Sequence, residues 1–319
     1  MRVHRRVGGR FLAGALGALV LVPLVGCGGA DQGGTADGEG GRTAGASVAD
    51  ADLAQDPEED FARLEEEYDV RLGVYALDTG SGEEIGYRED ERFAYASTFK
   101  ALLCGAVLEE YGLAGMDEVI PYGEEDLVPN SPVTEENLPE GGMSMSDLCD
   151  ATVRYSDNTA ANLLWDTIGG PAGLQERLVG LGDDTSRMNR YEPELNEAVP
   201  GDERDTSTPR VFAANLGAYV LGEVLPEPER AQLSEWLITN TTGDELIRAG
   251  VGEGWTVGDK TGAGGYGGRN DIAVLWPEDG GEPLLLAVYS TREEEDAEFD
   301  NALIAEAASV AVGALDSSR

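Results

Sequence analysis

Histidine and lysine are nearly absent from this sequence. Its 319 residues include a single histidine, His4, and lysine occurs only at Lys100 and Lys260. His4 lies in a segment that we expect to be removed, so the mature chain would contain no imidazole. Without imidazole, a Ser-His-Asp triad, a Cys-His dyad and a histidine-ligated zinc ion are excluded. We therefore expect neither a metal nor a cofactor.

Positive charge is also scarce. The sequence has 22 Lys plus Arg against 62 Asp plus Glu, a formal net charge of -40 at pH 7. A surface this acidic repels phosphates, so nucleic acid is excluded as a partner. Hydrophobic residues make up 41% of the chain, which is enough for a substantial core and argues against general disorder.

The N-terminal segment has the pattern of an export signal. Four arginines precede the apolar run Phe11–Val25, and no acidic residue occurs before Asp31. The run has about 15 residues, whereas a helix that spans a bilayer needs roughly 20. A plain transmembrane anchor is the alternative, and the pair Arg5-Arg6 leaves twin-arginine export open.

Cys27 ends this segment in the sequence Leu24-Val25-Gly26-Cys27, which resembles a bacterial lipobox. We expect residues 1–26 to be a signal peptide, cleaved so that Cys27 becomes the lipidated first residue. Cleavage would leave 293 residues with 18 Lys plus Arg against 62 Asp plus Glu, a net charge of -44. Residues 27–55 would form a flexible tether with a mean reach of roughly 30 Å. The protein would then be an exported lipoprotein on the outer side of the cytoplasmic membrane, with partial release as an alternative.

Two further cysteines, Cys104 and Cys149, would lie in an oxidising compartment. An even pair outside the cytoplasm favours a disulfide. Two buried free thiols are the alternative.

Hydrophobic periodicity predicts the secondary structure of a single domain over residues 56–319. A helix is expected from Asp56 as N-cap, with Pro57 at its first position and Glu59 three residues after the cap. Alternating patterns predict strands in two groups, and helical patterns dominate between them from Ser97 to about Leu237. The strands are expected at Arg71–Asp78, Glu84–Tyr87, Trp255–Lys260, Asp271–Trp276 and Leu284–Tyr289, and a final helix at Ala297–Leu315.

This order of elements describes an α+β fold, in which an antiparallel sheet is flanked by N- and C-terminal helices and an all-helical domain is inserted. The sheet part would comprise residues 56–95 and 250–319, and the helical part residues 96–249. A cleft between the two parts is the natural place for an active site.

Lys100 follows Ser97 by three residues, both in the first turn of the helix expected there. This spacing puts the two side chains on one face of the helix. Without histidine, a lysine whose pKa is lowered by burial and neighbouring charge is the plausible activator of a serine hydroxyl. The free N–H groups at the helix N-terminus would offer an oxyanion site above Ser97.

The second lysine begins the triplet Lys260-Thr261-Gly262, which is followed by Ala263 and two glycines. Small residues at this strand end would let a ligand approach the strand edge. Between the two lysines lies Ser156-Asp157-Asn158, which on its own would serve well as a helix cap.

Ser-x-x-Lys, Ser-Asp-Asn and Lys-Thr-Gly, in this order, are the motif set of class A β-lactamases and penicillin-binding proteins. From about residue 57 to 316 the chain resembles a class A β-lactamase. The resemblance includes Ser131–Thr134, the run from Ser156 to Leu164, residues 190–196 with 202–206, and Asn270–Val274. It implies a monomeric serine hydrolase that opens β-lactam rings and so confers β-lactam resistance.

By this resemblance Ser97 is the nucleophile, and the backbone N–H groups of Ser97 and Ala263 form the oxyanion hole. Lys100 helps to move the serine proton, directly or through water. Ser156 passes a proton to the departing lactam nitrogen. Asn158 binds the side-chain amide of the substrate.

Residues 190–196 resemble the Ω-loop signature of the class, in which a glutamate and an asparagine hold the deacylating water. Glu192 and Asn196 occupy these positions, and Asn158 is expected to hold Lys100 and Glu192 in place. In the family the peptide bond before Pro193 is usually cis.

The remaining expectations from the resemblance concern substrate binding and structure. Lys260, the hydroxyl of Thr261, Gly262 and Arg269 would form the site for the substrate carboxylate. Arg190 and Asp205 would pair across the base of the Ω-loop, and Cys104 and Cys149 occupy the positions at which some members have a disulfide.

The chain also departs from many members of the class. Pro129 and Asn130 replace an aromatic-bearing pair at the cleft rim, and Ala96 and Gly264 replace the additional cysteines of one carbapenem-hydrolysing group. Two other functions stay open. A DD-peptidase or penicillin-binding protein would lack the deacylating glutamate, and a non-catalytic cell-wall-binding lipoprotein would not need an intact nucleophile and both lysines.

Overall fold

The computed structural model describes residues 56–317, so the expected signal peptide, Cys27 and the tether lie outside the described residues. The first helix, α1 (Pro57–Tyr68), begins after Asp56, whose carboxylate accepts a hydrogen bond from the backbone N–H of Glu58 at 3.0 Å. In a capping box the side chain of Asp56 would accept from the backbone N–H of Glu59, but it accepts from that of Glu58 instead. Phe61 and Leu64 are fully buried, so the apolar face of α1 packs on the sheet.

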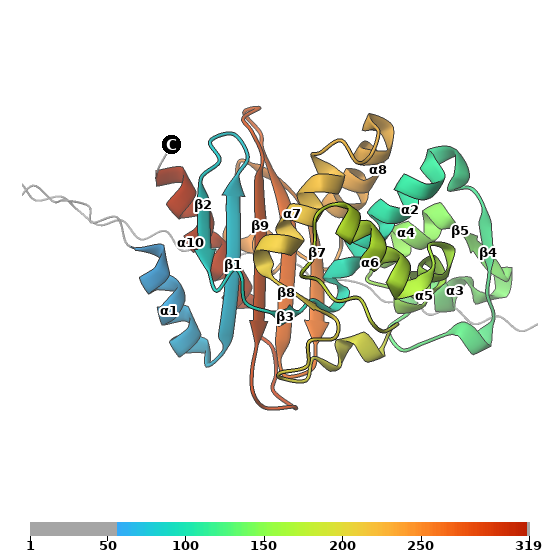
Figure 1. Cartoon of the computed structure of the whole chain (residues 1–319), viewed down its shortest axis with the longest axis horizontal. Coiled ribbons are helices and arrows are strands. Elements are labelled where there is room, and N and C mark those ends of the chain that lie inside the picture. Colours follow the sequence, from blue (N-terminus) through green and yellow to red (C-terminus); the bar gives the residue numbers. More distant parts are fainter. Residues whose placement is uncertain (1–55, 318–319) are drawn as a thin grey trace, which may run out of the picture. The chain divides into compact units, whose positions relative to one another are not determined.

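Five antiparallel strands form the central sheet in the order β2-β1-β9-β8-β7 (Figure 1). Strands from both ends of the chain meet in it, because β1 pairs with β9 along its whole length. The α+β class and the antiparallel sheet predicted from the sequence are therefore confirmed. The expected bounds are confirmed for β1 (Arg71–Asp78) and β2 (Glu84–Tyr87). Three strands extend beyond the expected bounds, namely β7 (Trp255–Gly264), β8 (Gly268–Pro277) and β9 (Leu284–Thr291).

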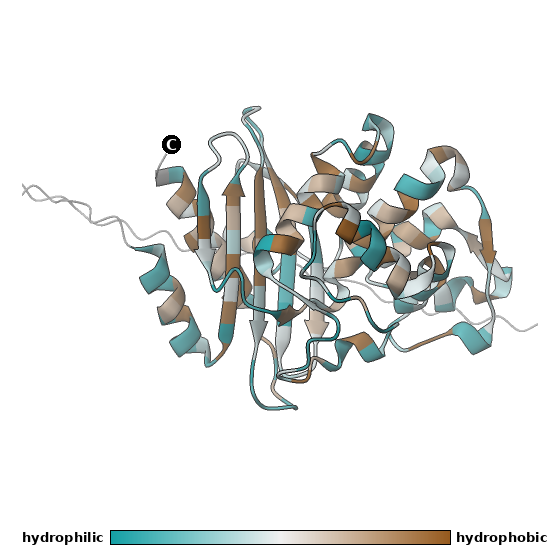
Figure 2. Ribbon diagram, in the orientation of Figure 1, coloured by the Kyte–Doolittle hydropathy of each residue, from teal (hydrophilic) through white to brown (hydrophobic). Residues whose placement is uncertain are grey.

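Both faces of this sheet are covered, which explains why its strands are largely apolar (Figure 2). Along β1, Leu72 and Val74 belong to one buried cluster and Tyr75 to the other, as the two-residue repeat of a strand requires. Helix α1 and the C-terminal helix α10 (Asn301–Ser317) pack on the first face. Helix α7 (Pro209–Val220) packs on the second, although the sequence assigned residues 96–249 to the helical part.

The helical part surrounds α2 (Phe99–Gly115), which is buried from Phe99 to Leu108. Helix α2 contacts α4, α5, α6, α7 and α8.

Among residues 56–317, no helix combines the length and apolar character needed to cross a bilayer. The further elements are α3 (Pro132–Asn137), α4 (Met145–Arg154), α5 (Asn158–Thr167), α6 (Gly170–Gly180), α8 (Glu227–Ile238) and α9 (Ile247–Gly250), the strand pairs β3 (Phe93–Ala94) with β6 (Thr206–Ser207) and β4 (Val119–Pro121) with β5 (Gly142–Ser144), and the 3-10 turns η1 (Ala96–Thr98), η2 (Glu124–Asp126), η3 (Leu138–Glu140) and η4 (Glu194–Glu197).

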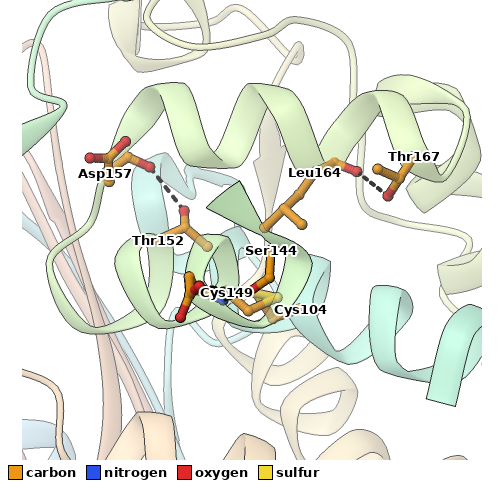
Figure 3. The surroundings of a disulfide bond; sticks show 8 residues. Cys104, Ser144, Cys149, Thr152, Asp157, Leu164 and Thr167 are labelled. Carbon is orange, nitrogen blue, oxygen red and sulfur yellow. Dashed lines mark hydrogen bonds between the residues drawn. A yellow bond between two sulfur atoms is a disulfide. The ribbon is translucent and has the colours of Figure 1, made fainter. Parts of the chain in front are cut away.

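A disulfide between Cys104 and Cys149 links α2 to α4 (Figure 3). Both residues are fully buried, and their Cα atoms lie 5.7 Å apart, within the usual range for disulfides. Also on α4, the hydroxyl of Thr152 donates to the backbone oxygen of Asp157 at 3.0 Å (Figure 3). The disulfide therefore connects the helix that follows Ser97 with the helix that precedes the Ser-Asp-Asn triplet.

Reducing this disulfide should lower the free energy of unfolding. The two cysteines are 45 residues apart in sequence, and closing a loop of that length restricts the unfolded chain by about 4 kcal/mol in the chain-entropy model. Urea unfolding with and without dithiothreitol measures the difference. A C104A/C149A variant is the control and should not respond to the reductant. An unchanged midpoint for the reduced wild-type chain would contradict the prediction.

Candidate active site

Ser97 lies on a 3-10 turn, not in the first turn of an α-helix as the sequence suggested. The turn η1 directly precedes α2, and Ser97 is only 7% exposed. Ala96 has a φ of 45°, a left-handed conformation that is costly for a residue other than glycine, so surrounding contacts must hold the turn. Strand β7 supplies such contacts. A methyl group on Gly262 would lie only 3.0 Å from the backbone oxygen of Tyr95, so glycine permits this close approach.

Lys100 is fully buried near the start of α2. Its ammonium lies 3.0 Å from Oε1 of Glu192, and it donates to Oδ1 of Asn158 at 2.5 Å and to the backbone oxygen of Ser156 at 2.9 Å. Burial lowers the pKa of Lys100, and the charge of Glu192 opposes that shift. Lys100 therefore joins the helix behind Ser97 to Glu192 and to the Ser-Asp-Asn triplet.

Lys260 is the second fully buried lysine, and it reaches the same triplet from β7. Its ammonium donates to the hydroxyl of Ser156 at 3.2 Å and to the backbone oxygen of Thr261 at 2.9 Å. Nζ of Lys100 lies 3.5 Å from the same hydroxyl. Burial, followed by the positive charge of Lys100, lowers the pKa of Lys260 to about 7. The Ser156 oxygen accepts from both lysines, so its own proton is free to be donated elsewhere.

The middle residue of the triplet, Asp157, has the capping role that the sequence allowed for. It is the N-cap of α5, and its fully buried carboxylate accepts from the backbone N–H of Ala160 at 2.9 Å. The same carboxylate accepts from the backbone N–H groups of Val133 and Thr134, each at 2.9 Å. Asp157 thus anchors the turn from which Ser156, with a φ of 58°, and Asn158 reach the lysines.

Glu192 lies in the segment that we call the Ω-loop, residues 190–205. Its side chain is fully buried, with Oε1 beside Lys100 and Oε2 accepting a hydrogen bond from the side chain of Asn196. Asn162 on α5 holds the backbone of Glu192 from both sides, donating to its oxygen at 2.8 Å and accepting from its N–H at 3.0 Å. The Glu192-Pro193 peptide bond is cis, as the resemblance implied. The carboxylate is thus fixed between two donors.

Arg190 and Asp205 form an ion pair across the base of the Ω-loop, with Nε and Oδ2 2.5 Å apart. Asp205 is fully buried and also accepts from the backbone N–H of Asn189 at 2.8 Å and from the hydroxyl of Tyr95 at 3.1 Å. Because Tyr95 immediately precedes the η1 turn, Asp205 ties the two ends of the Ω-loop to the turn that carries Ser97.

The edge strand β7 carries two further candidate residues beside Lys260. Ala263 is exposed, and its partner across the sheet is Arg269 on β8. The hydroxyl of Thr261 lies 2.6 Å from that of Thr242. Thr261 and Arg269 project from one face of the sheet and Lys260 from the other, since neighbouring residues on a strand alternate.

Three residues that hold the site were not identified as site residues from the sequence. Asn162 lies four positions after Asn158 on the same helix, so helical spacing could have indicated that both face the site. Asn130, which we read only as a departure from the family, donates to the backbone oxygen of Ser156 at 3.3 Å. The sequence around Thr242 does not indicate a role in the site, because the contact of Thr242 is with Thr261, which lies 19 positions away in the sequence.

The fold thus brings together the two lysines, the triplet and Glu192, and the chain as a whole is similar to known proteins. Residues 56–315 match the model of a family described as "Beta-lactamase enzyme family". A β-lactamase of Amycolatopsis lactamdurans is 55% identical over 258 residues, which covers 81% of this chain and 85% of that protein. The β-lactamase FAR-1 of Nocardia farcinica is 55% identical over 258 residues, which covers 80% of this chain and 82% of that protein.

Solved structures agree with this match. A halotolerant bacterial β-lactamase is 56% identical with a TM-score of 0.79, covering 81% of this chain and 98% of that chain. A class A β-lactamase from Clostridium kluyveri is 44% identical with a TM-score of 0.79, covering 81% of this chain and 98% of that chain. This chain belongs to class A of the β-lactamase enzyme family. Class A members are serine enzymes with the Ser-x-x-Lys, Ser-Asp-Asn and Lys-Thr-Gly motifs, which here lie around Ser97, Ser156 and Lys260.

The lowered pKa of Lys260 predicts a pH dependence for this class A enzyme. If protonated Lys260 binds the carboxylate of a penicillin, as the resemblance implies, kcat/KM, which reports on the free enzyme, should fall as the pH rises through about 7. Lys260→Arg should move this falling limb to higher pH, because a guanidinium stays protonated. Measuring kcat/KM from pH 5 to 10 for both enzymes is the test. Superimposable profiles would rule out Lys260 as the titrating group.

Proposed function

We propose that this class A β-lactamase hydrolyses β-lactam antibiotics through an acyl-enzyme on Ser97, which confers resistance to them. The observation that carries the proposal is the carboxylate of Glu192, buried between Lys100 at 3.0 Å and the side chain of Asn196. A base held in this way allows a second, water-dependent step after the serine has reacted.

In the acylation step the hydroxyl oxygen of Ser97 attacks the carbonyl carbon of the lactam. A new C–O bond forms, and the electron pair of the carbonyl double bond moves to its oxygen. The backbone N–H groups of Ser97 and Ala263 stabilise this oxyanion. The serine proton leaves through Lys100, directly or through water, and the lowered pKa of Lys100 makes it easier for the ammonium to give up a proton of its own and so take part in this transfer.

Collapse of the tetrahedral intermediate then breaks the C–N bond of the lactam ring. The departing nitrogen takes a proton from the hydroxyl of Ser156. This hydroxyl lies 3.2 Å from Nζ of Lys260 and 3.5 Å from Nζ of Lys100. A lysine ammonium can therefore return a proton to the Ser156 oxygen as the hydroxyl proton is lost.

Hydrolysis of the acyl-enzyme uses Glu192 as the base. A water bound by Glu192 and Asn196 gives a proton to the carboxylate, and its oxygen attacks the ester carbonyl. The C–O bond to Ser97 then breaks, and the proton that Glu192 took from the water returns to the serine oxygen by way of Lys100, which lies 3.0 Å from the carboxylate. The product is an opened lactam with a new carboxylate.

Substrate binding would use the edge of β7 and the side chain of Asn158. Lys260, the Thr261 hydroxyl and Arg269 receive the substrate carboxylate, with Gly262 permitting the close packing of β7 on η1. One hydrogen of the Asn158 amide nitrogen is donated to the backbone oxygen of Pro129 at 2.9 Å. An amide nitrogen has two hydrogens, so the second can be donated to the carbonyl of the substrate side chain.

We also propose that a lipid on Cys27 holds the monomeric mature enzyme at the outer face of the cytoplasmic membrane. The support is the sequence Leu24-Val25-Gly26-Cys27 at the end of an apolar run preceded by arginines. The tether of residues 27–55 would let the catalytic domain stand clear of the headgroups.

Removing the base should separate the two chemical steps. Glu192→Ala should accumulate acyl-enzyme, because deacylation loses a general base worth roughly 10²- to 10⁴-fold while acylation continues. Intact mass spectrometry after mixing with penicillin should then show a chain heavier by one penicillin, and Ser97→Ala, the control, should show none. Wild-type turnover by Glu192→Ala would refute the role of Glu192. Stable acylation of the wild-type enzyme without turnover would favour a penicillin-binding protein.

The lipid anchor is tested in whole cells. Wild-type protein should incorporate a clickable fatty acid and require detergent for extraction, because a thioether-linked lipid holds it in the bilayer. Cys27→Ala should lose the label. Equal labelling of both proteins, or none in the wild type, would contradict the anchor.

A further inference from the structure

Arg269 forms no ion pair within the part of the chain that the structure describes, although the sequence has 62 Asp plus Glu. Its Nε donates to Oδ1 of Asn301 at 2.7 Å, and its Nη1 lies 3.4 Å from the backbone oxygen of Gly262. The guanidinium carbon also lies 4.7 Å from the ring centre of Phe299. Arg269 is therefore held in place by neutral groups and keeps its charge available for an anion.

The amide of Asn301 can hold Arg269 in only one orientation. Its Oδ1 faces the guanidinium, and its Nδ2 donates to Oε2 of Glu245 at 2.7 Å. If the amide were turned over, its N–H groups would face the N–H groups of Arg269, and its oxygen would face a carboxylate. Donors cannot bond donors, and a carboxylate only accepts, so Glu245 selects the orientation that suits Arg269.

The segment that carries Glu245 also contacts another residue of the proposed carboxylate site. Residues 240–246 lie between α8 and α9. Thr242 in this segment lies 2.6 Å from the hydroxyl of Thr261, and Asn240 donates to the buried carboxylate of Asp259 at 2.7 Å. The segment is thus fixed to β7 at two points, so Glu245 approaches Asn301 from an anchored backbone.

We infer that Glu245 is a positioning residue for substrate binding, which orients the Asn301 amide and through it holds Arg269 ready for the substrate carboxylate. The neutral amide stands between the two charges, so that Glu245 does not itself pair with the guanidinium. This inference rests on the proposed role of Arg269 as a carboxylate-binding residue.

Glu245 then has two effects of opposite sign on substrate affinity. Its hydrogen bond to Asn301 favours binding, because it keeps Arg269 in place. Its negative charge opposes binding, because it repels the substrate carboxylate at longer range. Glu245 is exposed, so salt screens the second effect but leaves the first. One variant that removes only the charge of Glu245, and another that removes both the charge and the hydrogen bond, distinguish these two effects.

The test compares Glu245→Gln with Glu245→Ala on a chromogenic cephalosporin and on its methyl ester, which lacks the carboxylate charge. Glutamine keeps an oxygen that can accept from Asn301, so KM for the acid should stay at or below the wild-type value. Alanine removes the acceptor, so KM for the acid should rise roughly three- to tenfold with kcat within about twofold, a loss consistent with weakening one charge-assisted bond. The ester should be unaffected by either change.

Two controls make the result decisive. Glu253→Ala removes another exposed glutamate, in the turn before β7, and should leave both substrates unchanged. Arg269→Ala should weaken the preference for the acid over the ester. An unchanged preference would refute the proposed role of Arg269, independently of the results for the Glu245 variants. Equal KM values for the alanine and glutamine variants, or parallel losses on acid and ester, would overturn the role of Glu245. Rescue by glutamine also excludes a folding defect as the cause.

Discussion

Burial of the Lys100 ammonium is the constraint on which the rest of the site depends. A buried charge costs several kcal/mol unless it is paired and hydrogen-bonded. Its partners are Glu192 from the Ω-loop and two members of the Ser-Asp-Asn triplet, Asn158 and the backbone of Ser156, so the Ω-loop and the triplet must both meet α2 around one atom. Loss of Glu192 would leave the buried ammonium without its counter-charge. The residues that keep the loop and the helices together are therefore also the residues that the proposed mechanism uses.

The second lysine shows what this arrangement leaves unsatisfied. Lys260 is as buried as Lys100 but has no carboxylate at ion-pair distance among the described residues, and the charge of Lys100 adds to the effect of burial on its pKa. In the proposed function, a substrate carboxylate supplies the missing counter-charge. The rest of the surface is strongly acidic and repels such a substrate at long range, so affinity must come from close contacts. Arg269 likewise has no carboxylate at ion-pair distance among the described residues, because the Asn301 amide lies between it and Glu245.

Much of the fold was predictable because its signals are local. The bounds of β1 and β2 follow from alternation and turn residues within a few positions, and Asp56 and Pro57 mark the start of α1. The extension of β7 to Gly264 was missed, because a run of glycine and alanine has no strand pattern of its own and pairs here only because β8 lies beside it. The sequence also did not predict that α7 packs on the sheet, because an apolar face indicates that a helix is buried but not which surface it packs against.

The sequence by itself determined which groups are available: with no histidine after His4, and with lysine only at Lys100 and Lys260, proton transfer near a serine has to use lysine or a carboxylate. The three short motifs then indicated which serines, and the Ω-loop signature indicated which glutamate. The tertiary structure decided what holds them, namely the two hydrogen bonds of Asn162 to the Glu192 backbone, the three backbone N–H bonds to the Asp157 carboxylate, and the hydrogen bonds from Asn301 to Glu245 and from Arg269 to Asn301. The last of these joins residues from three distant parts of the sequence. No local pattern can reveal such contacts, because hydrogen bonds over this range exist only once the chain has folded.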